Sequence, residues 1–139
     1  MDLLNKELLK TNSRFQRLVL QDPHTGLYNY RYLEKVIEIE FFRAKRYNNP
    51  LSVTMLDIDY FNSINDVYGH QFGDVVLKQL ARQLKQMVRQ YDIVIRFGGE
   101  EFMIISPGIN RAQAIALAQR LLDAINLHSY GNKKHKVKL

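Results

Sequence analysis

Residues 93–105 read Ile93-Val94-Ile95-Arg96-Phe97-Gly98-Gly99-Glu100-Glu101-Phe102-Met103-Ile104-Ile105. Two apolar runs flank a central pair of glycines, and this pattern predicts a β-hairpin with Gly98 and Gly99 at its tip. A Gly-Gly pair is typical of a two-residue turn of the primed type, in which both central residues need positive φ. Because neither glycine has a Cβ, the phosphates of a ligand can approach the backbone closely. Glu100 and Glu101 follow directly and supply the hard oxygen ligands that Mg²⁺ prefers.

A second acidic segment follows the strand-like run of residues 51–56. Between Arg46 and Lys78 the chain contains no other Lys or Arg, but it contains four aspartates: Asp57, Asp59, Asp66 and Asp74. Because like charges at the end of a buried strand repel one another, this segment is expected to bind a divalent cation. The alternative is that Asp66 and Asp74 cap helices or form turns.

The composition limits the class of protein. The 139 residues suit one globular domain with an extension, and the absence of cysteine excludes disulfides and thiolate metal sites. No apolar stretch is long enough to cross a membrane and no signal peptide is evident, so a cytoplasmic domain is expected. The formal net charge is +6, but much of the excess Lys lies within residues 133–138 and no nucleic-acid-binding module is found. We therefore expect no nucleic-acid partner and no membrane segment.

The first 21 residues predict a helix of the coiled-coil type. Its seam follows the alternating spacing of a and d positions: Leu4, Leu8, Thr11, Phe15 and Leu18. An isolated helix of this length is marginal in water, so it is expected to pair with a second copy or to continue an upstream helix. The alternative is a single helix that packs on the domain. Residues 1–21 are thus interpreted as a linker, and Pro23 and Gly26 end its pattern.

The next segments combine helix and strand patterns. Residues 30–47 are expected to form an amphipathic helix with an apolar face made of Leu33, Ile37, Phe41 and Ala44. Residues 51–58 are expected to form the first, central strand. A short helical turn follows over residues 61–67.

Two longer helices are expected on either side of the hairpin. Asp74 opens the first, whose buried face consists of Val76, Leu80, Leu84 and Met87. Residues 111–127 form the second, whose buried face consists of Ile115, Ala118, Leu122 and Ile125. These elements predict a two-layer α+β domain in which helices pack against a mainly antiparallel sheet.

Several motifs together closely resemble the GGDEF family of diguanylate cyclases. They are, in chain order, Asp22-Pro23-His24-Thr25-Gly26-Leu27-Tyr28-Asn29, Asp57-Ile58-Asp59-Tyr60-Phe61, Ile64-Asn65-Asp66, Tyr68-Gly69-His70, Gly73-Asp74 and Gly98-Gly99-Glu100-Glu101-Phe102. Residues 22–139 are therefore identified as a GGDEF domain of the GGEEF variant. The resemblance implies a ferredoxin-like core similar to nucleotide cyclases and polymerase palms. It also implies that a homodimer, controlled by an upstream sensor or receiver domain, condenses two GTP molecules into cyclic di-GMP with release of two pyrophosphates.

The resemblance assigns catalytic roles to individual residues. Asp57, Glu100 and the carbonyl of Ile58 would bind Mg²⁺ or Mn²⁺, and two such ions can stabilise the attacking and leaving oxygens. Asp59 would support this site from outside the coordination shell. Glu100 is also the candidate acceptor of the 3′-hydroxyl proton, and Glu101 shares the catalytic site.

Substrate recognition is carried over in the same way. Asn65 and Asp74 would pair with the edge of guanine, whereas adenine would mismatch both side chains. The backbone N–H groups of Phe61 and Asn62, near the start of a short helix, would face the phosphates together with the glycine tip.

A regulatory site is implied a short distance before Gly98. The segment Arg89-Gln90-Tyr91-Asp92 resembles the RxxD motif of the family, which binds the product as an inhibitor. Arg can grip guanine with two hydrogen bonds and Asp can accept from its N–H groups. Arg120, on the later helix, is a candidate partner arginine. The alternative is an exposed Arg–Asp pair at a helix end.

Two features depart from the family pattern. Asn62 stands where the family usually has Lys, so turnover is expected to be slow because one cation facing the phosphates is lost. The chain also stops at Leu139, where the family continues with a strand, a hairpin and a helix that supplies basic residues. We therefore expect a domain without its C-terminal part, an unpaired sheet edge and low activity. Two alternatives to an active cyclase remain: a non-catalytic receptor for GTP or cyclic di-GMP, and a dimerising linker.

Overall fold

The chain forms five helices and five strands along residues 2–139, which are the residues that this computed structural model describes. The elements are, in chain order, α1 (Leu3–Leu20), α2 (Tyr30–Tyr47), β1 (Leu51–Asp57), α3 (Phe61–Tyr68), α4 (His70–Met87), β2 (Ile93–Arg96), β3 (Glu101–Pro107), α5 (Arg111–Leu127), β4 (Tyr130–Gly131) and β5 (Lys136–Val137).

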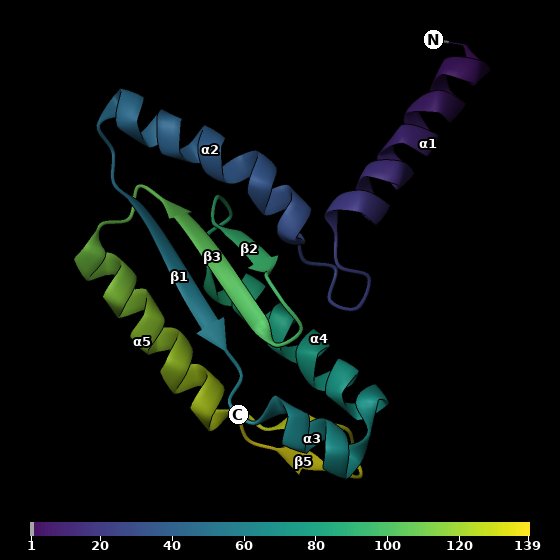
Figure 1. The fold of residues 1–139 in the computed structure, drawn as a ribbon, viewed down its shortest axis with the longest axis vertical. Helices are drawn as coiled ribbons and strands as arrows, with labels where there is room; N and C mark the ends of the chain where they lie inside the picture. Colours follow the sequence, from purple (N-terminus) through teal and green to yellow (C-terminus); the bar gives the residue numbers. More distant parts are fainter. Residues whose placement is uncertain (1) are drawn as a thin grey trace.

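Three antiparallel strands form the main sheet in the order β1-β3-β2 (Figure 1). β1 pairs with β3 from Leu51 opposite Pro107 to Asp57 opposite Glu101. β3 is therefore the central strand, and the expectation that residues 51–58 form the central strand is wrong. The physical reason is that β3 carries fully buried side chains, whereas no side chain of β1 is fully buried. Within residues 2–139, the second edge of β1 has no strand partner.

Alternate side chains of the sheet build apolar clusters on its opposite faces. On one face, Leu33 and Val36 of α2 cluster with Ile95 and Ile105. The other face packs on α4 and α5, and its cluster includes Val76, Leu80, Leu84, Val94, Phe102, Ile104, Leu117 and Leu121. The α+β class is confirmed, and α2 adds a layer on the second face of the sheet.

The helix α4 begins at His70, one turn before the predicted start. Gly69 precedes it with a φ of +90°, which lets the chain reverse sharply between α3 and α4. Asp74 therefore lies inside the helix, and the interpretation of Asp74 as a helix cap is wrong. The predicted buried face is confirmed by Val76, Leu80 and Leu84.

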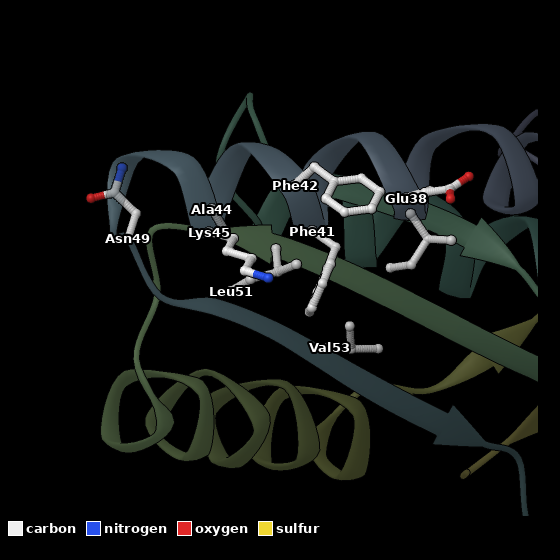
Figure 2. A pocket seen from close by; sticks show the side chains of 9 residues that line it. Glu38, Phe41, Phe42, Ala44, Lys45, Asn49, Leu51 and Val53 are labelled. Atoms are coloured by element: carbon white, nitrogen blue, oxygen red, sulfur yellow. The ribbon is translucent and has the colours of Figure 1, made fainter.

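The helix α2 has a different buried face from the one predicted. Leu33 and Val36 are buried together with Glu40, which accepts a hydrogen bond from Arg43, whereas Phe41 is exposed. Phe41 borders a groove of about 720 Å³ between α2 and the open edge of β1 (Figure 2). The open second edge of β1 explains the exposure of Phe41, because no strand within residues 2–139 pairs with that edge and covers this side of α2.

The buried face of α5 is likewise rotated from the predicted one. Leu117 and Leu121 are buried, whereas Ile115 and Leu122 are exposed. This helix has apolar residues around most of its circumference, so packing selects the buried stripe. Its contacts with α4 and β1 select the stripe that contains Leu117.

The helix α1 projects away from the sheet, and none of its described side chains is buried (Figure 1). The apolar side chains of the seam are all exposed: Leu4, Leu8, Phe15 and Leu18. The end of α1 is tied to the domain by Asn29, whose Nδ2 donates to the carbonyl of Val19 at 2.7 Å. Pairing of the exposed seam with a second copy stays a prediction. None of the helices in residues 2–139 combines the length and apolarity that crossing a membrane requires.

The short hairpin of β4 and β5 closes against α4. Tyr130 is fully buried and its hydroxyl donates to Gln83. The side chain of Gln79 donates to the carbonyl of Gly131 at 2.7 Å and accepts from its N–H at 2.8 Å. The strand pattern predicted near the end of the chain is confirmed at Lys136–Val137.

We predict that Gly131→Ala destabilises the domain by about 1–3 kcal/mol. Gly131 has a φ of +132°, and a Cβ there would overlap the backbone carbonyl of His135 and the ring of Phe72. Urea unfolding should show a lower midpoint. Gly99→Ala is the control because a Cβ there meets open space, so its midpoint should equal that of the parent. Equal midpoints for all three proteins would contradict the packing described for the hairpin.

Candidate functional site

The tip of the β2–β3 hairpin is wider than predicted. The N–H groups of Phe97 and Gly98 both donate to the carbonyl of Glu101, at 2.8 and 3.2 Å. Neither Gly98 nor Gly99 has positive φ, so the predicted two-residue primed turn is wrong. The guanidinium of Arg96 accounts for the difference, because it donates to the carbonyls of Gly98 at 3.3 Å and Gly99 at 2.8 Å.

The β1–β3 register brings the acidic residues of two motifs together. Asp57 lies directly opposite Glu101, and the N–H of Ile58 donates to the carbonyl of Glu100 at 3.1 Å. Opposite residues on antiparallel strands share one face of the sheet, so Asp57 and Glu101 lie side by side. Asp57 is exposed, and Glu100 and Glu101 are half-buried. The structure therefore joins the predicted metal-binding and catalytic residues at one end of the sheet.

The predicted crowding of four aspartates at a buried strand end is not found. Asp57 and Asp59 are exposed, Asp66 is exposed on α3, and Asp74 lies on α4. Within residues 2–139, no three His, Asp or Glu side chains gather into a preformed metal cluster. Charge repulsion is therefore not the reason to expect a cation here.

The donors at the end of β1 nevertheless suit one kind of ion. Mg²⁺ usually takes one or two protein carboxylates and completes its shell with water and substrate phosphates. Asp57 and Glu100, together with the carbonyl of Ile58, provide this set of hard oxygens. The residues present fit Mg²⁺ or Mn²⁺ bound together with a phosphate ligand.

The helix pair α3–α4 holds the two candidates for guanine recognition. Asn65 on α3 faces Gly73 on α4 so closely that a Cβ at Gly73 would overlap the Asn65 amide. Within residues 2–139, the Oδ1 atom of Asn65 is buried without a hydrogen-bond partner. Asp74 follows Gly73, and its carboxylate is partly exposed. A buried acceptor without a partner costs free energy, and this one lies near an accessible carboxylate.

The start of α3 has no side-chain cap. Tyr60 occupies the N-cap position with a φ of +59°, and its side chain makes no capping hydrogen bond. The first N–H groups of a helix have no partner within it, and here these belong to Phe61 and Asn62. The side chain of Asn62 is exposed and adds no positive charge.

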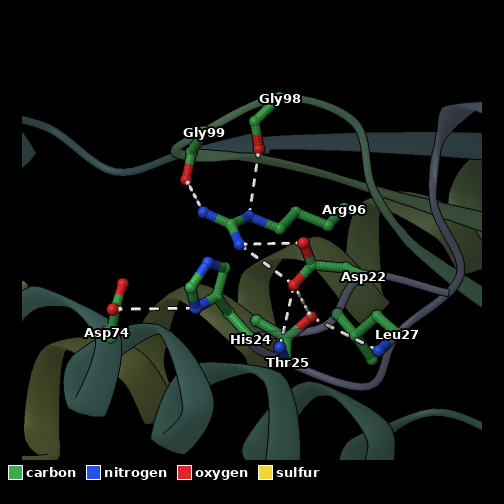
Figure 3. A network of polar contacts seen from close by, with 8 residues as sticks. All are labelled: Asp22, His24, Thr25, Leu27, Asp74, Arg96, Gly98 and Gly99. Atoms are coloured by element: carbon green, nitrogen blue, oxygen red, sulfur yellow. Dashed lines mark hydrogen bonds and ion pairs between the residues drawn. The ribbon is translucent and has the colours of Figure 1, made fainter. Parts of the chain in front are cut away.

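An ion pair that the sequence interpretation missed ties the hairpin to the segment before α2 (Figure 3). Arg96 Nη1 lies 3.0 Å from Asp22 Oδ2, and the two side chains are only 13% and 14% exposed. Asp22 also accepts from the N–H and the hydroxyl of Thr25, at 2.8 and 2.7 Å. Burial alone would raise the pKa of the Asp22 carboxyl, but hydrogen bonds from Thr25 and Arg96 bring its pKa below the ordinary value. The signal available in the sequence was Arg96 itself, a charge between apolar strand residues.

The predicted regulatory residues line a common cavity of about 380 Å³ between α4, α5 and the end of the sheet. Arg89, Asp92 and Arg120 all border it. Arg89 Nη2 donates to Asp92 Oδ1 at 2.8 Å and to the carbonyl of Pro107 at 2.6 Å. The alternative of an Arg–Asp pair at a helix end is therefore met in part: the ion pair forms after α4, with the Arg89 side chain 50% exposed but that of Asp92 only 1% exposed.

Residues 19–138 match the family described as "Diguanylate cyclase, GGDEF domain". The chain belongs to the GGDEF family. The probable diguanylate cyclase DgcC of Escherichia coli (strain K12) is 37% identical to it over 120 residues, which are 86% of this chain and 32% of DgcC. The GGDEF chain thus spans about a third of the length of this relative.

Solved structures agree with the GGDEF fold. Diguanylate cyclase SiaD from Pseudomonas aeruginosa, in complex with its activator SiaC, has a TM-score of 0.82 and 30% identity over 97% of this chain and 52% of SiaD. The coiled coil and GGDEF domain of DgcB from Caulobacter crescentus, in complex with c-di-GMP, has a TM-score of 0.87 over 96% of this chain and 70% of that one. Its 20% identity supports the fold alone.

We predict that Asp22→Asn destabilises this GGDEF domain by about 1–3 kcal/mol at pH 7, because it weakens hydrogen bonds to a buried charge. The folded-state pKa of Asp22 lies below its ordinary value of 3.8, so its carboxylate contributes stability above about pH 4. This contribution is lost as the pH falls through the folded-state pKa. Urea unfolding from pH 7 to pH 3 should show the difference between variant and parent shrinking.

Asp66→Asn provides the control for this pH series, because Asp66 is an exposed acid on α3. Its unfolding midpoint should stay close to that of the parent at every pH. A difference between Asp22→Asn and the parent that stays constant from pH 7 to pH 3 would contradict the ionic role of Asp22.

Proposed function

We propose that this GGDEF chain condenses two GTP molecules into cyclic di-GMP and releases two pyrophosphates. The observation that carries the proposal is the β1–β3 register, in which Asp57 lies opposite Glu101 at the end of the sheet that bears the glycine tip. Membership of the GGDEF family supports the same reaction. Because the chain spans about a third of DgcC, the activity of the whole protein is part of this proposal.

The reaction consists of two identical phosphoryl transfers. In each, the 3′-oxygen of one GTP attacks the α-phosphorus of the other, and the bond from that phosphorus to the β-phosphate oxygen breaks. Pyrophosphate leaves with the bonding electrons. The 3′-hydroxyl proton goes to a carboxylate, for which Glu100 is the candidate and Glu101 the neighbour that shares the site. Such reactions depend mainly on positioning and charge neutralisation.

The phosphate side of the site would combine a divalent ion with backbone donors. Asp57, Glu100 and the carbonyl of Ile58 would hold Mg²⁺ or Mn²⁺, which neutralises charge on the triphosphate when bound. The N–H groups of Phe61 and Asn62 would donate to phosphate oxygens at the uncapped start of α3. The glycine tip would let the phosphates approach the backbone, since a Cβ is absent there.

The base side would be formed by Asn65 and Asp74. The unpaired Oδ1 of Asn65 and the accessible carboxylate of Asp74 accept hydrogen bonds, and guanine presents N–H groups along one edge. Adenine lacks the N1–H and the 2-amino group. Discrimination between the two bases is large when such polar groups would be left unpaired.

Asn62 is proposed to make this chain a slow enzyme. A lysine at this position would place a cation at the start of α3, beside the phosphates. Loss of one such donor typically costs about 3–4 kcal/mol of transition-state stabilisation. The backbone N–H groups of Phe61 and Asn62 are uncharged, so they do not replace the charge of a lysine.

Catalysis would need two copies, because each domain binds one GTP. We infer that the exposed seam of α1 supplies the pairing and that an upstream sensor or receiver domain acts through this helix. The proposed substrate sets the reaction in the cytoplasm, where GTP is available.

A second candidate function is a receptor for cyclic di-GMP, with or without turnover. The cavity favours it, since Arg89, Asp92 and Arg120 all border one hollow. The solved DgcB relative is described in complex with c-di-GMP. In an active enzyme, the same binding would act as product inhibition.

We predict that Asp57→Ala or Glu100→Ala abolishes cyclic di-GMP formation from GTP and Mn²⁺ without changing the melting temperature by more than a few degrees. Both side chains lie at the sheet end outside the apolar clusters, so the fold does not depend on them. Chromatography measures the product. Glu38→Ala, on the exposed side of α2, is the control and should keep parental activity. Undiminished product from either acidic-site variant would remove that residue from the mechanism.

We also predict that Arg89→Lys weakens cyclic di-GMP binding by about 10-fold or more while GTP binding survives. Lysine keeps the charge but lacks the planar fork that pairs with guanine. Calorimetry measures both ligands. Arg82→Lys, an exposed arginine on α4, serves as the matched control. If Arg89→Lys binds cyclic di-GMP as tightly as the parent does, the resemblance of residues 89–92 to the RxxD motif is fortuitous.

A further inference from the structure

His24 lies between the two halves of the candidate site (Figure 3). Its Nδ1 atom is 3.6 Å from Oδ2 of Asp74, and the two side chains are 53% and 41% exposed. His24 belongs to the segment between α1 and α2, and Asp74 lies 50 positions later in the sequence, on α4. No role was assigned to His24 from the sequence. Its imidazole lies beside the Asp74 carboxylate, which is proposed to bind guanine.

The segment that carries His24 is held in one conformation. Gly26 N–H donates to the carbonyl of Asp22 at 2.8 Å, and Asp22 N–H donates to the carbonyl of Leu27 at 2.7 Å. Gly26 has a φ of +74°, which closes the turn, and Leu27 is buried in the core. The backbone at His24 is thus fixed from both sides, so little backbone freedom is lost when its ring faces Asp74.

The same segment is fixed to the hairpin tip. Asp22 pairs with Arg96, and the guanidinium of Arg96 donates to the carbonyls of Gly98 and Gly99. One short turn therefore contacts both the helix that bears Asp74 and the loop that faces the phosphates. A residue in this turn can align the base side of the site with the phosphate side.

The chemistry of guanine gives this contact a consequence. Guanine presents its N1–H and its 2-amino group side by side, and both oxygens of a carboxylate must be correctly oriented to accept from them. The Asp74 carboxylate is free to rotate about its terminal bond unless something holds it. An Nδ1–H of His24, present in the imidazolium and in one neutral tautomer, attracts Oδ2 across the 3.6 Å gap and opposes this rotation.

We propose that His24 is a positioning residue that sets the orientation of the Asp74 carboxylate and thereby the preference for guanine. The proposal rests on the proposed function of Asp74. It concerns recognition of the 2-amino group, which distinguishes guanine from hypoxanthine. The imidazole acts through Asp74 and does not itself take part in phosphoryl transfer.

Equilibrium binding of three nucleotides tests the proposal. The probes are the α,β-methylene analogues of GTP, ITP and ATP, in which the bond that would release pyrophosphate cannot be broken. ITP lacks only the 2-amino group. We expect the parent to prefer the GTP analogue over the ITP analogue, and His24→Leu and His24→Ala to lose roughly 10-fold of this preference, as happens when an orienting partner is removed.

Three further variants give the controls. His24→Asn should retain most of the preference, because its amide can donate to Asp74. His70→Leu removes another exposed imidazole, from the start of α4, and should leave the preference unchanged. Asp74→Asn should abolish the preference and serves as the reference. Thermal melting of each variant checks the fold.

The outcomes separate this inference from the proposed function. If Asp74→Asn loses the preference while His24→Leu and His24→Ala keep it, the role of His24 is wrong and the guanine site stands. Equal weakening of all three nucleotides in the His24 variants would also overturn it, since the residue would then only support the fold. If Asp74→Asn keeps the parental preference, the proposed base site falls and this inference falls with it.

Discussion

The antiparallel register of β1 on β3 is the constraint on which the rest of this domain depends. Ile104 and Ile105 are neighbours on β3, yet each is fully buried in a different cluster, on opposite faces of the sheet. A slip of one residue would turn every side chain of a strand to the other face and exchange these two environments. The same register sets Asp57 opposite Glu101. Packing of isoleucines several residues away therefore decides where the acidic groups at the sheet end lie.

The sequence predicted the helices and strands well where local signals agree. Asn29 caps α2 through its side chain, and Asn110 caps α5 with a capping box, so both helices begin where the pattern indicates. The predictions are wrong where contacts between distant parts of the chain determine the local structure. The turn at Gly98 depends on a guanidinium that reaches its carbonyl, and the exposure of Phe41 on α2 depends on the open edge of β1. Hydrophobic spacing alone contains neither fact.

The residues of the candidate site likewise include some that the sequence predicted and some that it did not. The acids at the sheet end and the Asn65 region could be found because their motifs are contiguous in the sequence. The Asp22–Arg96 pair could not, because its partners are 74 residues apart and meet only when the hairpin folds back on the segment before α2. Burial of Asp92 was missed for a similar reason, since a four-residue motif does not reveal which of its charges the core will cover.

Groups proposed to face the substrate and groups that support the site differ in their bonding. Asp57 and Asn62 are exposed, and Oδ1 of Asn65 has no hydrogen-bond partner within residues 2–139. In contrast, Asp22 and Arg96 are nearly covered and satisfy one another. A polar group left unpaired costs free energy, which a ligand can recover on binding, whereas a satisfied pair has nothing further to gain. Loss of a ligand-facing group should therefore change binding with little effect on unfolding, while loss of a supporting group should change both. Measuring both the free energy of unfolding and the ligand affinity of each variant therefore distinguishes residues that face the substrate from residues that support the site.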